Sequence, residues 1–173
     1  LDVDATGLAA GDIQIGDMHA EVVAATDRVD VKQLTLRTMG GEAVVVGTLK
    51  PRLDYPFDAV VKWSSVDLAD VLDTLGVKDP WVSVQNSGRA KVSGHLIPKG
   101  LNDPVLTGTA HIDVKELLSR DRSYRLGSFK TILQLKNATV DTKLSLYGDR
   151  LELEDAAVQG DPGRIDCNVR FYF

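Results

Sequence analysis

Apolar and polar residues alternate along most of this 173-residue chain. In Leu53–Trp63, the clearest stretch, the odd positions are Leu, Tyr, Phe, Ala, Val and Trp, and the even positions are mostly polar. Successive side chains on a β-strand point to opposite faces, so this pattern predicts a strand with one wholly apolar face. Shorter alternating segments follow, separated by Gly, Pro, Asn and Asp. We therefore predict an all-β fold with one antiparallel sheet over residues 1–173.

One segment has a helical rather than a two-residue period. Its apolar positions are spaced i, i+3, i+4 and i+7, a stripe typical of one helix face: Leu68, Val71, Leu72 and Leu75. Ser65 is a suitable N-cap, and Gly76 is a suitable residue to follow the C-terminus. We predict a single short helix over residues 65–75, lying over one end of the sheet.

Local signals predict where strands bend and end. A one-residue slip in the alternation between Val31 and Leu34 indicates a β-bulge. Lys136–Asn137, Tyr147–Asp149 and Gly160–Gly163 contain residues typical of turns. Residues 116–118 are expected to form one helical turn.

The chain also repeats itself. Gly41–Leu49 matches Gly88–Leu96, and Asp27–Val31 matches Asp149–Leu153. The second match continues without a gap from Leu34 and Leu36 to Ala156 and Val158. Recurring units of a few strands are typical of arrays that stack neighbouring repeats.

Composition excludes several classes of protein. Apolar residues make up 43% of the chain, and the net charge is −5. Nucleic-acid binding favours a basic patch, and the sequence contains no Lys/Arg cluster. Cys167 is the only cysteine, which rules out an internal disulfide. We find no signal peptide and no apolar run long enough for a transmembrane helix. Since both ends fall within alternating segments, we expect a fragment of a longer protein.

The residues expected on the inward face form a long apolar set: Leu53, Tyr55, Phe57, Val61, Trp63, Val92, Leu96, Leu106, Ile112, Phe129, Leu133, Leu135, Val140, Leu144, Leu146, Ile165, Cys167, Val169 and Phe171. Leaving them wet forfeits on the order of 20–50 kcal/mol, far above the ~5–15 kcal/mol net stability of a domain. Either the sheet packs on itself as a sandwich, or it curls around apolar guests such as acyl chains. Gly47, Gly94 and Gly108 at inward positions permit close approach or sharp curvature, which favours curling.

The recurring unit resembles the TamB/AsmA-like envelope proteins of Gram-negative bacteria. It consists of an apolar strand, a Gly-Gly or Pro-Gly turn, and a strand ending in Gly-x-Leu, as in Gly41–Leu49 and Gly88–Leu96. Asp103–Ala110 adds a Pro-x-Leu-x-Gly step that opens a strand. The helix expected over residues 65–75 resembles the short helix that interrupts the sheets of this family.

This resemblance implies a sheet curled into a taco-like groove with an apolar interior. It implies a non-enzymatic, periplasm-spanning protein, anchored in the inner membrane by a segment outside this chain. The groove would shield phospholipid acyl chains during transport to the outer membrane. The TamB branch also implies a BamA-like outer-membrane barrel partner and a role in the translocation and assembly module.

Two other functions compete with lipid transport. One is a chaperone-like groove that accepts strands of unfolded outer-membrane proteins by edge pairing. The other is a plain β-sandwich interaction module. No cofactor, metal or catalytic arrangement is expected. His19, His95 and His111 fall on the polar face of their strands, Asp67, Asp70 and Asp73 fit a solvated helix face, and Cys167 fits a small inward residue.

Overall fold

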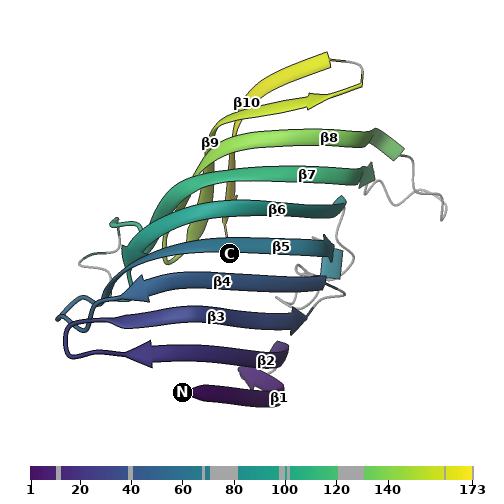
Figure 1. Cartoon of the computed structure of the whole chain (residues 1–173). Coiled ribbons are helices and arrows are strands. Elements are labelled where there is room, and N and C mark those ends of the chain that lie inside the picture. The colour runs from purple at the N-terminus through teal and green to yellow at the C-terminus, as the bar shows by residue number, and fades with distance from the viewer. Residues whose placement is uncertain are drawn as a thin grey trace.

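A computed structural model of the chain describes residues 1–10, 13–38, 41–67, 69–70, 82–97, 100, 102–120, 131–161 and 163–172. Ten antiparallel strands follow one another in chain order in a single sheet (Figure 1). Their bounds are β1 Asp2–Ala10, β2 Ile13–Ala24, β3 Val29–Thr38, β4 Gly41–Leu49, β5 Pro56–Asp67, β6 Val82–His95, β7 Leu106–Arg120, β8 Thr131–Leu146, β9 Arg150–Gly160 and β10 Gly163–Tyr172. The predicted all-β, antiparallel fold is confirmed.

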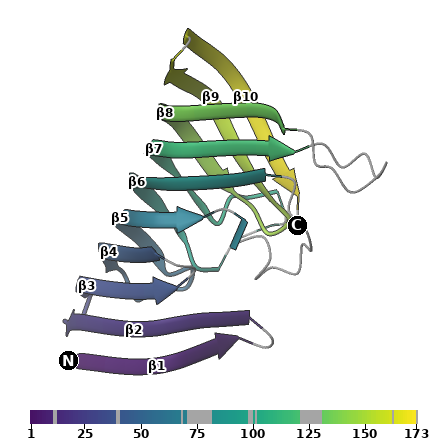
Figure 2. The same ribbon diagram turned by 90° about the vertical axis from the view of Figure 1, so that its right-hand side faces the viewer.

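The sheet is curled but not closed. β1 pairs only with β2, and β10 pairs only with β9, so both outer strands are edges of the described sheet. Figures 1 and 2 show β9 and β10 turning across the direction of the strands before them. Among the described elements, substantial contacts join only strands that are neighbours in the sheet. This part of the chain therefore forms one layer, and the alternative of a sheet packed on itself as a sandwich is wrong for it.

The predicted β-bulge in β3 is confirmed. The pairing of β3 with β4 shifts register between Val31 and Leu34. The matching segment in β9 carries an equivalent bulge, since β10 pairs with Leu153 and then with Ala156. An ion pair recurs as well. Arg28 Nε lies 3.2 Å from Asp30 Oδ2, and Arg150 Nε lies 2.9 Å from Glu152 Oε1. The sequence repeat is thus a structural repeat that includes its irregularity.

The prediction that Ser65 begins a helix is wrong. Ser65 lies within β5, with φ of 58°, and its N–H donates to Ser87 Oγ at 3.1 Å. Asp67 instead accepts a hydrogen bond from the N–H of Ala69 at 2.8 Å, the contact expected of an N-cap. Only Ala69 and Asp70 are helical among the described residues. Leu68 and residues 71–75 of the predicted helix lie outside the described residues.

Two further local predictions are wrong, both inside long strands. Lys136–Asn137 is not a turn, because β8 runs through it without a break and Asn137 adopts φ of 52°. Residues 116–118 belong to β7, where Leu117 pairs with Val84 and Leu135. Polar residues that suit a turn also suit the left-handed backbone of an irregular strand position. The turn at Tyr147–Asp149 is confirmed by the 2.8 Å hydrogen bond from Tyr147 N to Arg150 O.

Candidate functional site: the apolar face of the sheet

Cross-strand register places apolar residues of neighbouring strands side by side. Residues that pair directly across antiparallel strands point to the same face of a sheet. Following these pairs from strand to strand gives continuous rows across the molecule. The first row crosses β2 to β10 and is entirely apolar: Ala24, Val29, Leu49, Phe57, Gly94, Leu106, Leu146, Leu151 and Phe171.

Three more rows run beside the first. The second holds Val22, Val31, Gly47, Ala59, Val92, Gly108, Leu144, Leu153 and Val169. The third holds Val3, Ala20, Leu34, Val45, Val61, Ala90, Ala110 and Thr142. The fourth crosses all ten strands, with Ala5, Met18, Leu36, Ala43, Trp63, Gly88, Ile112, Val140, Val158 and Ile165. We call these four rows the apolar face. They contain no charged residue.

The most buried residues of the sheet are small. In the described part of the chain, the buried apolar residues are Ala20, Ala90, Ala110, Val114, Ala138 and Ala156. Among the described residues, no large side chain is fully buried. Large members of the face, such as Phe57, Val61 and Trp63, are half-buried. A two-layer core would bury its largest side chains most deeply. This pattern is instead that of a one-layer sheet whose bulky side chains shelter the small ones between them.

Glycines on the apolar face bring strands and rings close together. A Cβ added at Gly88 would lie 2.5 Å from Cζ2 of Trp63, so the indole covers this glycine. Trp63 Nε1 donates to Asn86 Oδ1 at 2.6 Å, which fixes the ring there. At Gly108, an added Cβ would overlap the backbone carbonyl of Lys91 on β6. These contacts require glycine, and they match the expectation that glycines on this face allow close approach.

Thr142 is the one polar member of the four rows, and its hydroxyl is satisfied. It is buried, with 6% of its surface exposed. Its Oγ1 donates to the backbone carbonyl of Glu154 at 2.9 Å, beside the bulge in β9. The hydroxyl therefore stabilises an irregular strand position and does not offer a polar group to a ligand.

Most of the predicted inward residues lie on this face. Those placed there by register are Phe57, Val61, Trp63, Val92, Leu106, Ile112, Val140, Leu144, Leu146, Ile165, Val169 and Phe171, and Cys167 pairs with buried Ala156 between the second and fourth rows. Leu133 and Leu135 lie in β8 beyond these rows. Phe129 lies outside the described residues.

Three predicted residues lie off the face. Leu53 is in the turn before β5 and is 97% exposed. Tyr55 precedes β5 with φ of 47° and is 40% exposed, and Leu96 follows β6 and is 56% exposed. The hydrogen bond from Tyr55 N to Arg52 O closes a turn, so the alternation predicted over Leu53–Trp63 does not extend to Leu53 and Tyr55. Sequence reasoning left out the contribution of β2, β3 and β4, although the alternation of Leu34, Leu36 and Val45 was a usable signal.

The opposite face carries charge. One row of pairs there crosses all ten strands: Asp4, His19, Thr35, Val44, Lys62, Arg89, His111, Asp141, Ala157 and Asp166. His19 Nδ1 lies 2.8 Å from Asp4 Oδ1, and His111 Nδ1 lies 2.7 Å from Asp141 Oδ1. The hydrogen bond to Asp141 raises the pKa of His111. The prediction that His19 and His111 occupy the polar face is confirmed.

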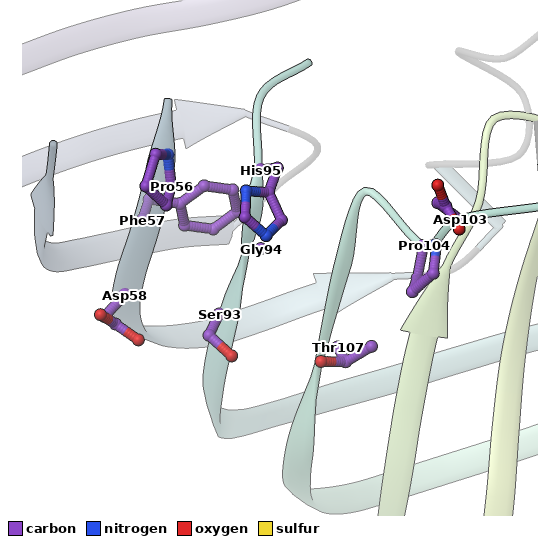
Figure 3. A pocket seen from close by; sticks show the side chains of 9 residues that line it. All are labelled: Pro56, Phe57, Asp58, Ser93, Gly94, His95, Asp103, Pro104 and Thr107. Carbon is purple, nitrogen blue, oxygen red and sulfur yellow. The ribbon is translucent and has the colours of Figure 1, made fainter. Parts of the chain in front are cut away.

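A hollow of about 460 Å³ lies where the first row meets charged residues. Figure 3 shows Phe57 beside Gly94 and His95, with Asp58, Ser93 and Asp103 around the same space. His95 Nδ1 lies 2.9 Å from Asp54 Oδ2. The hollow is open and lies at one end of the sheet. Asp58 and Ser93 pair with each other, so they point to the face opposite Phe57. Among the described residues, no group of His, Cys, Asp and Glu is arranged to hold a metal ion.

Comparison of the chain with protein-family models, curated proteins and solved structures gives no match. Within the described part of the chain, no helix is both long enough and apolar enough to cross a membrane.

Proposed function

We propose that this chain is a non-enzymatic segment of a lipid-transport protein of the bacterial envelope, and that its apolar face shields phospholipid acyl chains. One observation carries the proposal. Four uncharged rows extend over as many as ten strands on one side of a single-layer sheet. An apolar surface of this extent favours a partner that is itself apolar.

The shape of the surface favours acyl chains over a compact ligand. The rows run across the strands, and the hollow at the end of the first row is open. Small residues such as Ala90, Ala110 and Gly108 lie between bulkier neighbours on this face. A long, flexible hydrocarbon chain gains contact area over the bulkier side chains without needing specific polar groups. Head groups would remain at the margin, beyond the first row, near Asp103 in the segment before β7.

The proposed location in the periplasm, between inner and outer membranes, and the proposed BamA-like barrel partner are what the resemblance to TamB/AsmA-like proteins implies. The location and the partner are inferred from the recurring Gly-x-Leu units in the sequence. The lipid-binding face is inferred from the pairing of residues between neighbouring strands.

Two adjacent valines of β4 provide a matched test. Val45 belongs to the third row of the apolar face, and Val46 points to the opposite face with 47% exposure. Each is changed to Asp. Both variants are expressed in the periplasm of a Gram-negative bacterium, and bound phospholipid is measured by native mass spectrometry and solvent extraction. We expect Val45→Asp to lower bound phospholipid on the order of tenfold, because a carboxylate must then be desolvated against hydrocarbon.

Val46→Asp should retain wild-type phospholipid. Circular dichroism and thermal melts of both variants establish that the comparison is between folded proteins. Equal phospholipid in the two variants, or none in the wild type, would overturn the lipid-shielding function. Co-purification of unfolded outer-membrane proteins through Val45 in place of lipid would support the chaperone-like alternative.

A further inference from the structure

Three basic side chains on the polar face of β5 and β6 have no acidic partner. Lys62 pairs directly with Arg89, and Lys91 lies two residues beyond Arg89 on the same strand, so all three point to one face. Each of them is exposed. Within the described part of the chain, none of the three forms an ion pair or a hydrogen bond through its side chain. We call Lys62, Arg89 and Lys91 the basic patch.

The neighbours of the basic patch explain why its charges stay unpaired. Two positions away along its strands, outside the patch itself, stand only serine and valine. None of the residues that pair with it from neighbouring strands is acidic: Val44, Val60, Thr109 and His111. By contrast, Lys143 on the same face lies 2.7 Å from a carboxylate oxygen of Asp155. Like charges directly opposite each other are unfavourable, so an anion from outside the chain would relieve the repulsion within the patch.

Three valines extend the basic patch with apolar surface. Val46 pairs with Val60, and Val44 pairs with Lys62. Val60 also pairs with Lys91, so the valines and the cations are direct neighbours. Val46 is 47% exposed. A hollow of about 380 Å³ is lined by Val46, Val60 and Lys91 among others. The polar face therefore offers exposed apolar area next to unpaired positive charge.

We propose that the basic patch and these valines form a docking surface for an acidic, amphipathic helix of another protein. Directly paired residues have Cβ atoms about 4.5–5.5 Å apart, and residues i and i+4 of a helix are about 5–6 Å apart. Two carboxylates one helical turn apart therefore match the spacing of Lys62 and Arg89. The guanidinium of Arg89 can donate two parallel hydrogen bonds to one carboxylate. Apolar side chains of the helix would cover Val46 and Val60.

The charges around the patch favour a protein partner over a membrane surface or a nucleic acid. Carboxylates stand diagonally across from the patch, at Glu42, Asp58 and Asp113. An anionic bilayer or a phosphate backbone presents negative charge along its whole length, so it would also meet these carboxylates. A helix can place its acidic residues over the basic patch alone. Like-charge contacts at the border of a surface disfavour the wrong partner.

A pair of synthetic peptides tests the docking surface. Each peptide has about 18 residues, which is long enough to form a helix, with leucines along one side. One carries Glu at positions i and i+4 beside the leucines, and the other carries Gln there. Binding to the whole chain is measured by fluorescence anisotropy. We expect the Glu peptide to bind about tenfold more tightly than the Gln peptide at about 50 mM salt, and this advantage to shrink at about 300 mM because salt screens the charges.

Two charge-matched double variants locate the binding site. Arg89→Gln/Lys91→Gln should weaken binding of the Glu peptide about tenfold, because it removes two of the three unpaired cations. Lys50→Gln/Arg52→Gln removes the same charge from exposed positions in the segment before β5, and it should bind the peptide as the wild type does. Circular dichroism establishes that both variants are folded. Equal weakening by the two variants, or equal binding of the two peptides, would overturn the proposal.

Val46→Asp separates this proposal from the lipid function, on which it does not depend. The substitution should weaken binding of the Glu peptide, because it adds a carboxylate and removes apolar contact, while wild-type phospholipid is retained. Vesicles of phosphatidylglycerol provide the competing probe. Vesicles that bind through Arg89 and Lys91, with no binding of the Glu peptide, would overturn the proposal in favour of a membrane surface. Because phospholipid carried on the apolar face is measured separately, failure here is distinct from failure of the lipid function.

Discussion

The two faces of this sheet are built from the same strands yet differ in chemistry. On one face, four rows cross the molecule without a charge, and their bulky side chains are half-buried by one another. On the other, a row of ten residues holds Asp4, His19, Lys62, Arg89, His111, Asp141 and Asp166. A sheet wetted on both sides would have charge on both. The uncharged face is therefore the functional candidate.

The comparison also shows why register matters more than alternation. β4 contains Val44, Val45 and Val46 in succession, so its local sequence does not distinguish the faces. Pairing does so, because Val45 stands opposite Val61 while Val44 stands opposite Lys62. Face identity is thus fixed by several strands together.

The largest expected difference in stability between the two faces is at Trp63, on the apolar face. We expect Trp63→Ala to destabilise the fold by about 2–4 kcal/mol, because it uncovers Gly88 and removes the hydrogen bond to Asn86. Lys62→Ala, the neighbouring residue on the polar face, should change stability by less than about 0.5 kcal/mol. Urea unfolding measures both. Equal losses would mean that the two faces contribute alike.

A smaller loss of stability is expected at Gly108, where β6 and β7 approach each other closely. Gly108→Ala should cost about 1–3 kcal/mol, since the added methyl overlaps the carbonyl of Lys91. Gly148→Ala is the control, because nothing lies within 4 Å of an added Cβ in that turn. Thermal melts of the two variants should separate clearly. A neutral Gly108→Ala would show that β6 and β7 can move apart freely.

The smallest effect is expected on the polar face, at His111. Its hydrogen bond to Asp141 raises its pKa above the ordinary value of 6.5. Folding then favours the protonated ring, so the stabilisation is complete below about pH 6.5 and is lost as the pH rises through the raised value. Wild type should lose slightly more stability than His111→Gln between about pH 6 and pH 8.5. Identical pH profiles would contradict this assignment. The side chain is 52% exposed, which keeps the effect small.

The features that were predicted correctly from the sequence follow from the two-residue alternation of apolar and polar residues. The all-β fold, the bulge between Val31 and Leu34, and most of the inward set are visible as alternation or as a slip in it. The repeat of Asp27–Val31 in Asp149–Leu153 correctly indicated equivalent strands, which share their rows and their bulge.

What the sequence did not predict depends on backbone conformation at single residues. Tyr55, Ser65 and Asn137 each adopt positive φ, and each lies where a predicted strand, helix or turn was wrong. Their residue types are compatible with more than one local structure, and pairing with neighbouring strands decides between them. The extent of the apolar face was likewise underestimated. Alternation was visible in β3 and β4, but pairing is what shows that β2, β3 and β4 continue the same rows.

The most direct test of the lipid-shielding face places a photoreactive amino acid at residue 45 or residue 46 of the whole chain. Each variant is expressed in the periplasm, irradiated and analysed by mass spectrometry for covalent phospholipid. The account predicts phospholipid adducts at residue 45 and almost none at residue 46, since adjacent positions of β4 point to opposite faces. Equal adducts at both residues, or adducts at residue 46 alone, would contradict it.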